Sequence, residues 1–301
     1  MKIDTLVLSG GSTKVPAYMG IFKALYSCNI LNDKLQGIKH IITCSVGTLV
    51  ALFLLLKVPL DIIETVIEGA IFSNMINIEN ININDLIFNL GLFDNHLVSS
   101  LIKGVLTEKY SREDMTLLEL YELNPIKLTV KCANSTKGCI EYISYENEPN
   151  ISILTLVNMT TAIPLFFKPI KYKDSLYVDG GMTGGYPVEI VKDNYLGFNI
   201  KCEKKECKHE LYDLLPIVGH FISLLGVKCI DYDITPSVNT INIITDVHCT
   251  SFDISLTKKK ELIKIGYDTT VEHIKKYKLT NDLLNEQHHE DLSPTEGGPD
   301  S

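Results

Sequence analysis

The first 56 residues repeat one pattern that constrains the fold strongly: an apolar run, a turn of small residues, and then a helical period. Residues 3–8 form the first apolar run, which ends in Ser-Gly-Gly and predicts a buried strand entering a tight turn. Residues 16–26 then carry apolar side chains at helical spacing. Residues 38–43 and 47–56 repeat the strand and the helix. A strand, a helix and another strand in this order predict an α/β fold with a mostly parallel sheet.

Hydrophobicity patterns further along the chain predict more elements of both kinds. We predict helices over residues 60–72, 95–107, 116–122, 151–161, 187–192 and 258–277, and strands over residues 126–133, 139–145, 167–170, 176–178, 195–200 and 239–244. The strands at 126–133 and 139–145 flank a polar turn, as in a hairpin. Residues 210–228 are amphipathic, whereas residues 75–90 are rich in Asn and their isoleucines follow the strand period of two only in part. We interpret the Asn-rich segment as a surface excursion.

The composition is that of a folded globular protein. The chain has 301 residues, of which 45% are hydrophobic and 22% are charged, and this length is sufficient for a sizeable core. We predict a single domain over residues 1–284. Residues 285–301 are polar, contain Pro and Gly and lack apolar periodicity, so we predict that this tail is disordered.

The net charge of −9 argues against several classes of partner. Affinity for a nucleic-acid backbone comes from Lys and Arg, so we predict no nucleic-acid partner, and the same argument weighs against electrostatic docking on anionic membranes. The longest apolar stretch, residues 46–56, is shorter than the about 20 residues that a membrane span needs. We therefore predict a buried core helix there and no transmembrane segment.

The eight cysteines occur without a recognisable secretory signal and indicate reduced thiols. We predict a cytoplasmic protein that could bind membranes peripherally. Abundant Ile, Asn and Lys are typical of an AT-rich genome, such as that of a large DNA virus or of some bacteria. Cys202, Cys207 and His209 could bind a metal, but their spacing matches no common zinc pattern and we favour an exposed loop. Since no calcium-loop motif is present, we predict no metal and no cofactor.

Ser45 lies at the second strand-to-helix turn, in the pentapeptide TCSVG. This turn is either a plain one with a helix-capping serine or a nucleophile elbow of the G-x-S-x-G kind whose first glycine is replaced. A serine hydrolase also needs a base and backbone N–H donors for an oxyanion. Gly10 and Gly11, at the first turn, could supply the donors. Asp179, in an Asp-Gly-Gly turn after a later strand, could supply the base.

Five segments within residues 1–200 resemble the patatin-like phospholipase family. TCSVGT is similar to the family's nucleophile elbow, with the nucleophile at Ser45, and LVLSGGSTKVPAYMGIFKAL is similar to its glycine-rich loop and first helix. LYVDGGMTGGYPVEI is similar to the segment that carries the second catalytic residue, here Asp179. TLLELYELNPIKLTV and TTAIPLFFKPIKY resemble two further landmarks of the family.

The resemblance implies a three-layer α/β/α fold and a calcium-independent lipid acyl hydrolase of the phospholipase A or lysophospholipase type. Ser45 would attack the ester carbonyl of a phospholipid or another acyl lipid at a membrane or micelle surface. Asp179 would accept the serine proton directly, without a histidine. The oxyanion would be held by the N–H groups of Gly10, Gly11 and Ser12. These groups would be supported by five neighbours, Lys14, Thr43, Gly47, Gly180 and Gly181.

Three expectations about the site follow. A free Asp has a pKa near 3.9 and is a weak base at neutral pH, so we expect burial under the two glycines, away from cations, to raise the pKa of Asp179. Lys14 either contacts a substrate phosphate or is a solvated lysine at the start of a helix. An apolar lid over residues 71–93 would explain how an acidic protein meets a membrane.

Three positions depart from the family pattern. Ser12 and Val15 replace glycines of the loop, which we expect to stiffen it, and Thr43 replaces the first glycine of the elbow. Because Ser45 and Asp179 are both present, we favour an active enzyme. The alternative is a catalytically degenerate relative that acts as a lipid-binding or protein-binding module.

Overall fold

The computed structural model describes residues 2–71, 89–192, 194–203, 237–247 and 251–280. Within them, eight strands form one mixed sheet in the order β10-β9-β1-β2-β4-β8-β7, with β5 paired to β4. These strands are β1 (Thr5–Leu8), β2 (His40–Cys44), β4 (Lys127–Asn134), β5 (Cys139–Ile143), β7 (Ile170–Tyr172), β8 (Ser175–Asp179), β9 (Tyr195–Cys202) and β10 (Thr240–Thr245). A separate two-stranded sheet pairs β3 (Gly91–Phe93) with β6 (Leu165–Phe167).

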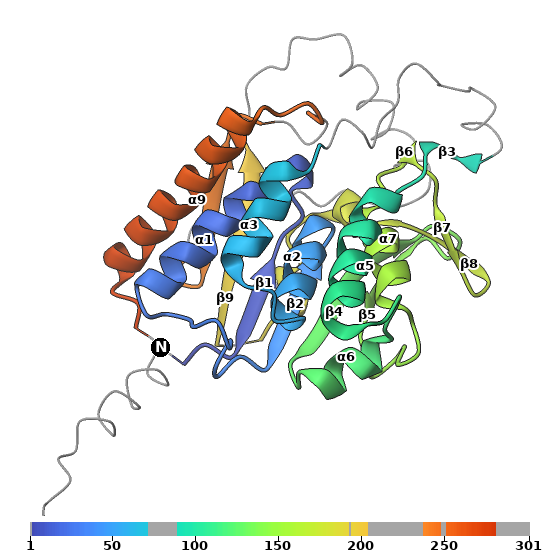
Figure 1. The fold of residues 1–301 in the computed structure, drawn as a ribbon, viewed down its shortest axis with the longest axis horizontal. Helices are drawn as coiled ribbons and strands as arrows, with labels where there is room; N and C mark the ends of the chain where they lie inside the picture. The colour runs from blue at the N-terminus through green and yellow to red at the C-terminus, as the bar shows by residue number, and fades with distance from the viewer. Residues whose placement is uncertain (1, 72–88, 193, 204–236, 248–250, 281–301) are drawn as a thin grey trace, which may run out of the picture.

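The main sheet is mostly parallel and is covered by helices (Figure 1). Strands β10, β9, β1, β2 and β4 run parallel, whereas β5 and β8 pair antiparallel with β4, and β7 antiparallel with β8. The helices are α1 (Pro16–Ser27), α2 (Val46–Leu55), α3 (Leu60–Gly69), α5 (His96–Tyr110), α6 (Leu117–Leu123), α7 (Ile153–Thr161) and α9 (Leu256–Tyr277). This architecture confirms the predicted α/β class and three-layer α/β/α fold.

Burial explains why the first two strands are continuous apolar runs. Leu6, Val7 and Leu8 in β1 are each 0% exposed, although successive side chains of a strand point to opposite faces of the sheet. Both faces of the sheet are therefore covered at this point, as is usual for parallel strands. All ten residues of α2 are buried, which explains why this helix has no polar face.

Several predicted elements occur, but two are wrong in detail. The predicted strand over 167–170 is two strands, β6 and β7, because Lys168 and Pro169 separate them and proline has no N–H for the ladder. The predicted helix over 187–192 is one 3₁₀ turn, Val188–Ile190. The predicted hairpin at 126–145 is confirmed by the antiparallel pairing of β4 with β5.

Some predictions fall on residues that the structure does not describe. They concern the amphipathic segment 210–228, the tail 285–301, Cys207 and His209, and most of the Asn-rich segment 75–90 and of the lid over 71–93. These interpretations, and the single domain over 1–284, stay predictions. Of the lid, the described part includes β3, which lies against β6.

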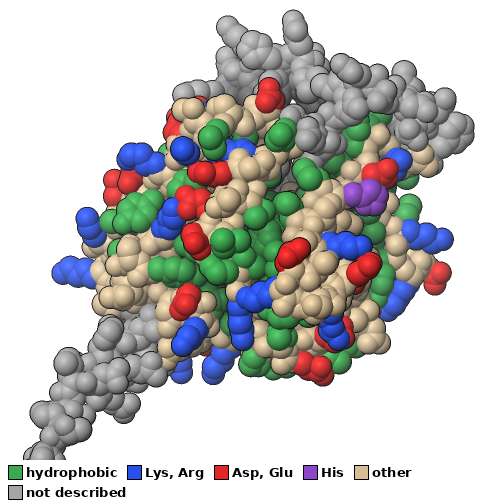
Figure 2. Space-filling view, viewed as in Figure 1, with side chains coloured by type: hydrophobic (Ala, Val, Ile, Leu, Met, Phe, Trp, Pro, Cys, Tyr) green, Lys and Arg blue, Asp and Glu red, His purple; other side chains and the backbone are tan. Residues whose placement is uncertain are grey.

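The surface of the near face is charged but mixed in sign. Figure 2 shows Lys and Arg side chains interspersed with Asp and Glu, with hydrophobic atoms between them. This face therefore offers no basic stripe of the kind that nucleic-acid binding requires. Of the helices that the structure describes, none combines the length and the apolar composition of a membrane span.

Two glycines let α1 and α9 approach at backbone distance. A Cβ atom at Gly20 in α1 would lie 1.8 Å from the carbonyl oxygen of Ile263 in α9. A Cβ at Gly266 in α9 would lie 2.1 Å from the carbonyl oxygen of Ala17 in α1. The contact between α1 and α9, the first and the last described helices, thus requires glycine at both positions (Figure 1).

We expect Gly20→Ala and Gly266→Ala each to lower the free energy of unfolding by about 1–3 kcal/mol, because the added methyl groups overpack the helix crossing. Gly104→Ala in α5 is the matched control, since a Cβ there meets nothing within 4 Å. Alanine is the better helix former, so this control should stabilise the protein by about 0.5–1 kcal/mol. Urea unfolding followed by circular dichroism measures the free energy of unfolding of all three variants. A change of the same sign in all three would contradict the prediction.

Candidate active site

The pairing of β4 brings Ser45 and Asp179 together. One edge of β4 is taken by β5, which pairs with residues 130–134. The other edge is shared: β2 pairs with it as far as Cys44 opposite Lys131, and β8 begins at the next position, with Asp179 opposite Cys132. Since β2 is parallel and β8 antiparallel to β4, their carboxyl ends meet head to head. Ser45 follows directly after β2, so it faces the last residue of β8.

Ser45 and Asp179 are in direct contact. Ser45 Oγ donates a 2.6 Å hydrogen bond to Asp179 Oδ2. Ser45 is 6% exposed and Asp179 is 3% exposed. Ser45 has φ 50° and ψ −131°, a left-handed backbone conformation that a residue other than glycine adopts at a cost of about 1–3 kcal/mol. The sharp turn between strand and helix that the elbow requires is therefore present at Ser45.

Gly47 allows the elbow to pack against β1. A Cβ atom at Gly47 would lie 2.7 Å from the carbonyl oxygens of both Leu8 and Ser9. Thr43, which lies in β2 two residues before Ser45, is 0% exposed, and its Oγ1 lies 2.8 Å from Thr48 Oγ1 in α2. Thr43, at the position of the first elbow glycine, thus fits between strand and helix, because the Thr48 hydroxyl is a hydrogen-bond partner for its own buried hydroxyl.

The backbone of Ser45 is held by Thr160, which the sequence analysis did not single out. The Ser45 N–H donates to Thr160 Oγ1 at 2.8 Å, and the same hydroxyl donates to the Lys131 carbonyl oxygen at 2.8 Å. Thr160 lies in α7 and is 0% exposed. The only signal was the family-like stretch TTAIPLFFKPIKY, which does not say which threonine matters.

Burial makes Asp179 a better base than a free aspartate. Desolvation raises its pKa to about 6, against lowering contributions from its hydrogen bonds with the Ser45 hydroxyl and the Gly181 N–H. The Gly181 N–H donates to Asp179 Oδ1 at 2.7 Å, so each carboxylate oxygen has a donor. A Cβ at Gly180 would lie 2.4 Å from the Lys131 carbonyl oxygen, so the turn after Asp179 requires glycine there.

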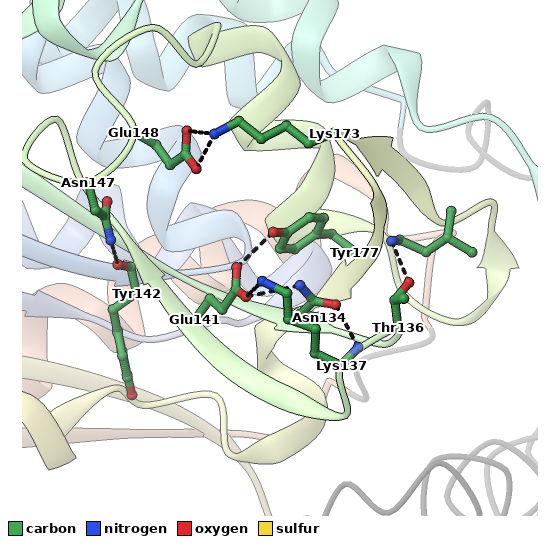
Figure 3. A network of polar contacts seen from close by, with 10 residues as sticks. Asn134, Thr136, Lys137, Glu141, Tyr142, Asn147, Glu148, Lys173 and Tyr177 are labelled. Atoms are coloured by element: carbon green, nitrogen blue, oxygen red, sulfur yellow. Dashed lines mark hydrogen bonds and ion pairs between the residues drawn. The ribbon is translucent and has the colours of Figure 1, made fainter.

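Polar contacts also fix the strand that carries Asp179 (Figure 3). Tyr177 in β8 donates its hydroxyl proton to Glu141 Oε2 in β5 at 2.7 Å. The other oxygen of Glu141 accepts from Asn134 Nδ2 and from Lys137 Nζ, both at 3.0 Å. Nearby, Lys173 pairs with Glu148 at 2.7 Å. Strand β8 is thereby tied to the β4–β5 hairpin.

The glycine-rich loop lies beside the serine, but its first N–H is occupied. A Cβ at Gly10 would lie 3.1 Å from Ser45 Cβ, which shows how closely loop and elbow approach. The Gly10 N–H donates to the Gly185 carbonyl oxygen at 2.8 Å, so Gly10 no longer belongs among the oxyanion donors expected from the sequence. Within the part of the chain that the structure describes, the N–H groups of Gly11 and Ser12 have no acceptor.

Two further loop residues, Ser12 and Lys14, bear on the expectations from the sequence. Ser12 has φ 50°, in the region that favours glycine, so the backbone keeps the conformation that a glycine would take without strain. Lys14 is 3% exposed, and the alternative of a solvated lysine at the helix start is therefore wrong.

The described residues contain no group of three or more His, Cys, Asp and Glu side chains that could hold a metal ion. Cys202 lies half-buried at the end of β9, and the other two members of its predicted cluster, Cys207 and His209, lie outside the described chain. Cys44 and Cys132, the thiols that flank the site, are free and fully buried. Burial raises the pKa of both thiols, so they stay neutral beside Asp179.

Relatives of the chain occur in large DNA viruses. The chain is 28% identical over 189 residues to the probable lipid hydrolase 463L of Invertebrate iridescent virus 6, an alignment that spans 62% of each protein. It is 22% identical over 291 residues to the uncharacterized protein R571 of Acanthamoeba polyphaga mimivirus, which covers 91% of this chain and 94% of that protein.

Solved structures share the fold. VipD from Legionella pneumophila superposes with a TM-score of 0.66 at 17% identity, over 92% of this chain and 67% of VipD. The type III effector protein ExoU superposes with a TM-score of 0.52 at 13% identity, over 93% of this chain and 54% of that structure. Residues 6–192 match the family model described as patatin-like phospholipase. The chain therefore belongs to the patatin-like phospholipase family.

Proposed function

We propose that the protein is a lipid acyl hydrolase that cleaves carboxylic esters through an acyl-serine intermediate. The observation that carries this proposal is the hydrogen bond between Ser45 Oγ and the buried carboxylate of Asp179, at a turn where the serine backbone is strained. Ser45 attacks the ester carbonyl while its proton passes to Asp179 Oδ2. The alcohol leaves with a proton, and water then attacks the acyl-serine with Asp179 as the base.

The oxyanion that forms during attack needs donors in place beforehand. The N–H groups of Gly11 and Ser12 are our candidates, because they lie in the loop that packs on Ser45 and have no acceptor among the described residues. One such donor is typically worth about 10²–10³ in rate. Helix α2 begins directly after Ser45, and its positive N-terminal end favours the same negative charge.

The family and a viral relative described as a probable lipid hydrolase support a lipid as the substrate. We propose a phospholipid or another acyl lipid at a membrane or micelle surface, cleaved as by a phospholipase A or lysophospholipase. The reaction requires no calcium, because attack and proton transfer use side chains alone. A cytoplasmic site of action in a virus-infected cell, with peripheral membrane contact, fits these relatives.

The first test is fatty-acid release from phospholipid in mixed micelles with a calcium chelator present. We expect wild-type protein to be active, and Ser45→Ala and Asp179→Asn each to lose at least about 10³-fold in kcat, because they remove the nucleophile and its base. Asp174→Asn is the matched control, since Asp174 is an exposed residue of the same β7–β8 hairpin and should keep full activity.

A fluorophosphonate probe separates an enzyme from a binding module. Wild-type protein should be labelled at Ser45, and Ser45→Ala should not. If folded wild-type protein neither releases fatty acid nor reacts with the probe, the hydrolase proposal fails and the degenerate lipid-binding or protein-binding module takes its place.

The rate should depend on pH through Asp179. Its carboxyl group must be ionised to accept the serine proton, and its pKa is raised by burial to about 6. We therefore expect kcat/KM for a soluble p-nitrophenyl ester to rise with pH and level off above about 6. An acid limb near the ordinary aspartate value of 3.8 would show that a different group controls the reaction.

Burial of Asp179 should also cost stability at neutral pH. The pKa of about 6 in the folded protein exceeds the ordinary value of 3.8, so between these pH values the folded protein binds more protons than the unfolded chain. Stability then falls as pH rises through this range, by as much as about 3 kcal/mol. Asp179→Asn should accordingly be more stable than wild type at pH 8 and lose that advantage at pH 4. Parallel urea curves at both pH values check this, and an advantage of equal size at both would contradict it.

A further inference from the structure

Lys131 is a buried cation between the two halves of the site. It lies in β4, opposite Cys44 of β2, and one position before Cys132, the partner of Asp179. Its side chain is 1% exposed. A lysine is almost never fully buried unless it is paired. The contacts of the Lys131 ammonium group therefore indicate its role.

The ammonium group of Lys131 binds the turn that follows Asp179. Lys131 Nζ donates to the Gly184 carbonyl oxygen at 2.9 Å and to Glu189 Oε1 at 2.6 Å. Tyr142 in β5 donates its hydroxyl proton to the same oxygen of Glu189. Figure 3 shows Tyr142 with its backbone oxygen bound to Asn147, so the residue that anchors Glu189 is itself part of the hairpin network.

That turn in turn holds the glycine-rich loop. The residue after Gly184 is Gly185, whose carbonyl oxygen accepts the Gly10 N–H at 2.8 Å. Gly10 is followed by Gly11 and Ser12, the proposed oxyanion donors. A continuous series of contacts therefore runs from the Lys131 ammonium through the turn to the loop.

The backbone of Lys131 reaches the nucleophile as well. Its carbonyl oxygen accepts from Thr160 Oγ1, and Thr160 Oγ1 accepts the Ser45 N–H. Gly180 packs on the same carbonyl, where any Cβ would be too close. Lys131 thus contacts both Thr160, which binds the Ser45 N–H, and Gly180, which follows Asp179 in the chain.

We propose that Lys131 is a positioning residue of this site: its ammonium group fixes the turn of residues 180–185, so that Asp179 faces Ser45 while the N–H groups of Gly11 and Ser12 face the ester. This inference rests on the proposed hydrolase function. It assigns to Lys131 no contact with substrate, because Gly184 and Glu189 take its ammonium group.

The same ammonium group acts on Asp179 electrostatically. Among the described residues, the titratable groups around the Asp179 carboxylate are the thiols of Cys44 and Cys132 and the Lys131 ammonium, with Glu189 paired to that ammonium. Both thiols are neutral because burial raises their pKa. The positive charge of Lys131 lowers the pKa of Asp179, against the larger effect of desolvation, so the expectation that this carboxylate lies away from cations is wrong. Without the charge, Asp179 should take up its proton at a higher pH.

The test compares Lys131→Met, which keeps the length of the side chain but not its charge, with Lys131→Arg, Glu189→Gln and wild type. Lys127→Met is the matched control: it removes an ion pair, with Glu146, from the other end of the same strand. Three quantities are measured on folded protein: kcat and KM for a soluble ester, and the titration midpoint of Asp179. The midpoint comes from ¹³C NMR of aspartate-labelled protein, with Asp179→Asn assigning the resonance.

In Lys131→Met we expect kcat to fall by about 10²-fold at nearly constant KM, because the reacting groups lose their alignment. The Asp179 midpoint should rise by about one pH unit. Lys131→Arg should return the midpoint towards the wild-type value. Glu189→Gln should lower kcat without raising the midpoint, since the charge remains but its anchor is lost.

The inference is overturned if folded Lys131→Met matches Lys127→Met in both kcat and midpoint. If Lys131→Met does not fold, an unchanged kcat in Glu189→Gln overturns it. If wild-type protein hydrolyses no ester, the proposed function fails, and the Asp179 midpoint then decides alone whether Lys131 acts on this carboxylate.

Discussion

The site depends on one edge of β4, which two strands share end to end. Strand β2 leaves this edge at Cys44, and β8 takes it over at Asp179. Had β8 run parallel to β2, its carboxyl end would lie away from the serine. The antiparallel entry of one strand into a parallel sheet therefore creates the contact between Ser45 and Asp179, which lie 134 residues apart in the chain. The elbow, the glycine turn and the buried lysine all gather around that junction.

The sequence was sufficient to predict the parts of this arrangement that are local. The strand, the turn and the helix around Ser45 follow from apolar periodicity and small residues, and burial of Asp179 is expected from the two glycines that follow it. Hydrogen bonds between distant segments carry no such local pattern. The pairs Ser45–Thr160, Lys131–Gly184 and Gly10–Gly185 were therefore invisible, and the Gly10 N–H was assigned a role that its bond to Gly185 prevents.

Local rules also explain where the predictions were wrong. Residues 167–170 have strand-like side chains, yet Pro169 interrupts the ladder and separates β6 from β7. Two of the three glycine replacements, Thr43 and Ser12, have different consequences. Thr43 is accommodated because Thr48 supplies a hydrogen-bond partner, whereas Ser12 takes a backbone conformation with φ 50° that costs energy. Replacement of glycine by Thr43 affects side-chain packing, whereas replacement by Ser12 strains the backbone. The residue types alone do not distinguish these two effects.

The contact between α1 and α9 has a consequence for how the chain acquires its site during synthesis. Helix α1 follows the glycine-rich loop near the N-terminus, but the helix it packs against ends at Tyr277. Strand β1 likewise needs β9 as a neighbour. A growing chain on the ribosome therefore contains Ser45 long before the glycine-rich loop beside it has its packing partners. We expect the site to stay unformed in the nascent polypeptide until the segment that ends at Tyr277 has emerged from the ribosome.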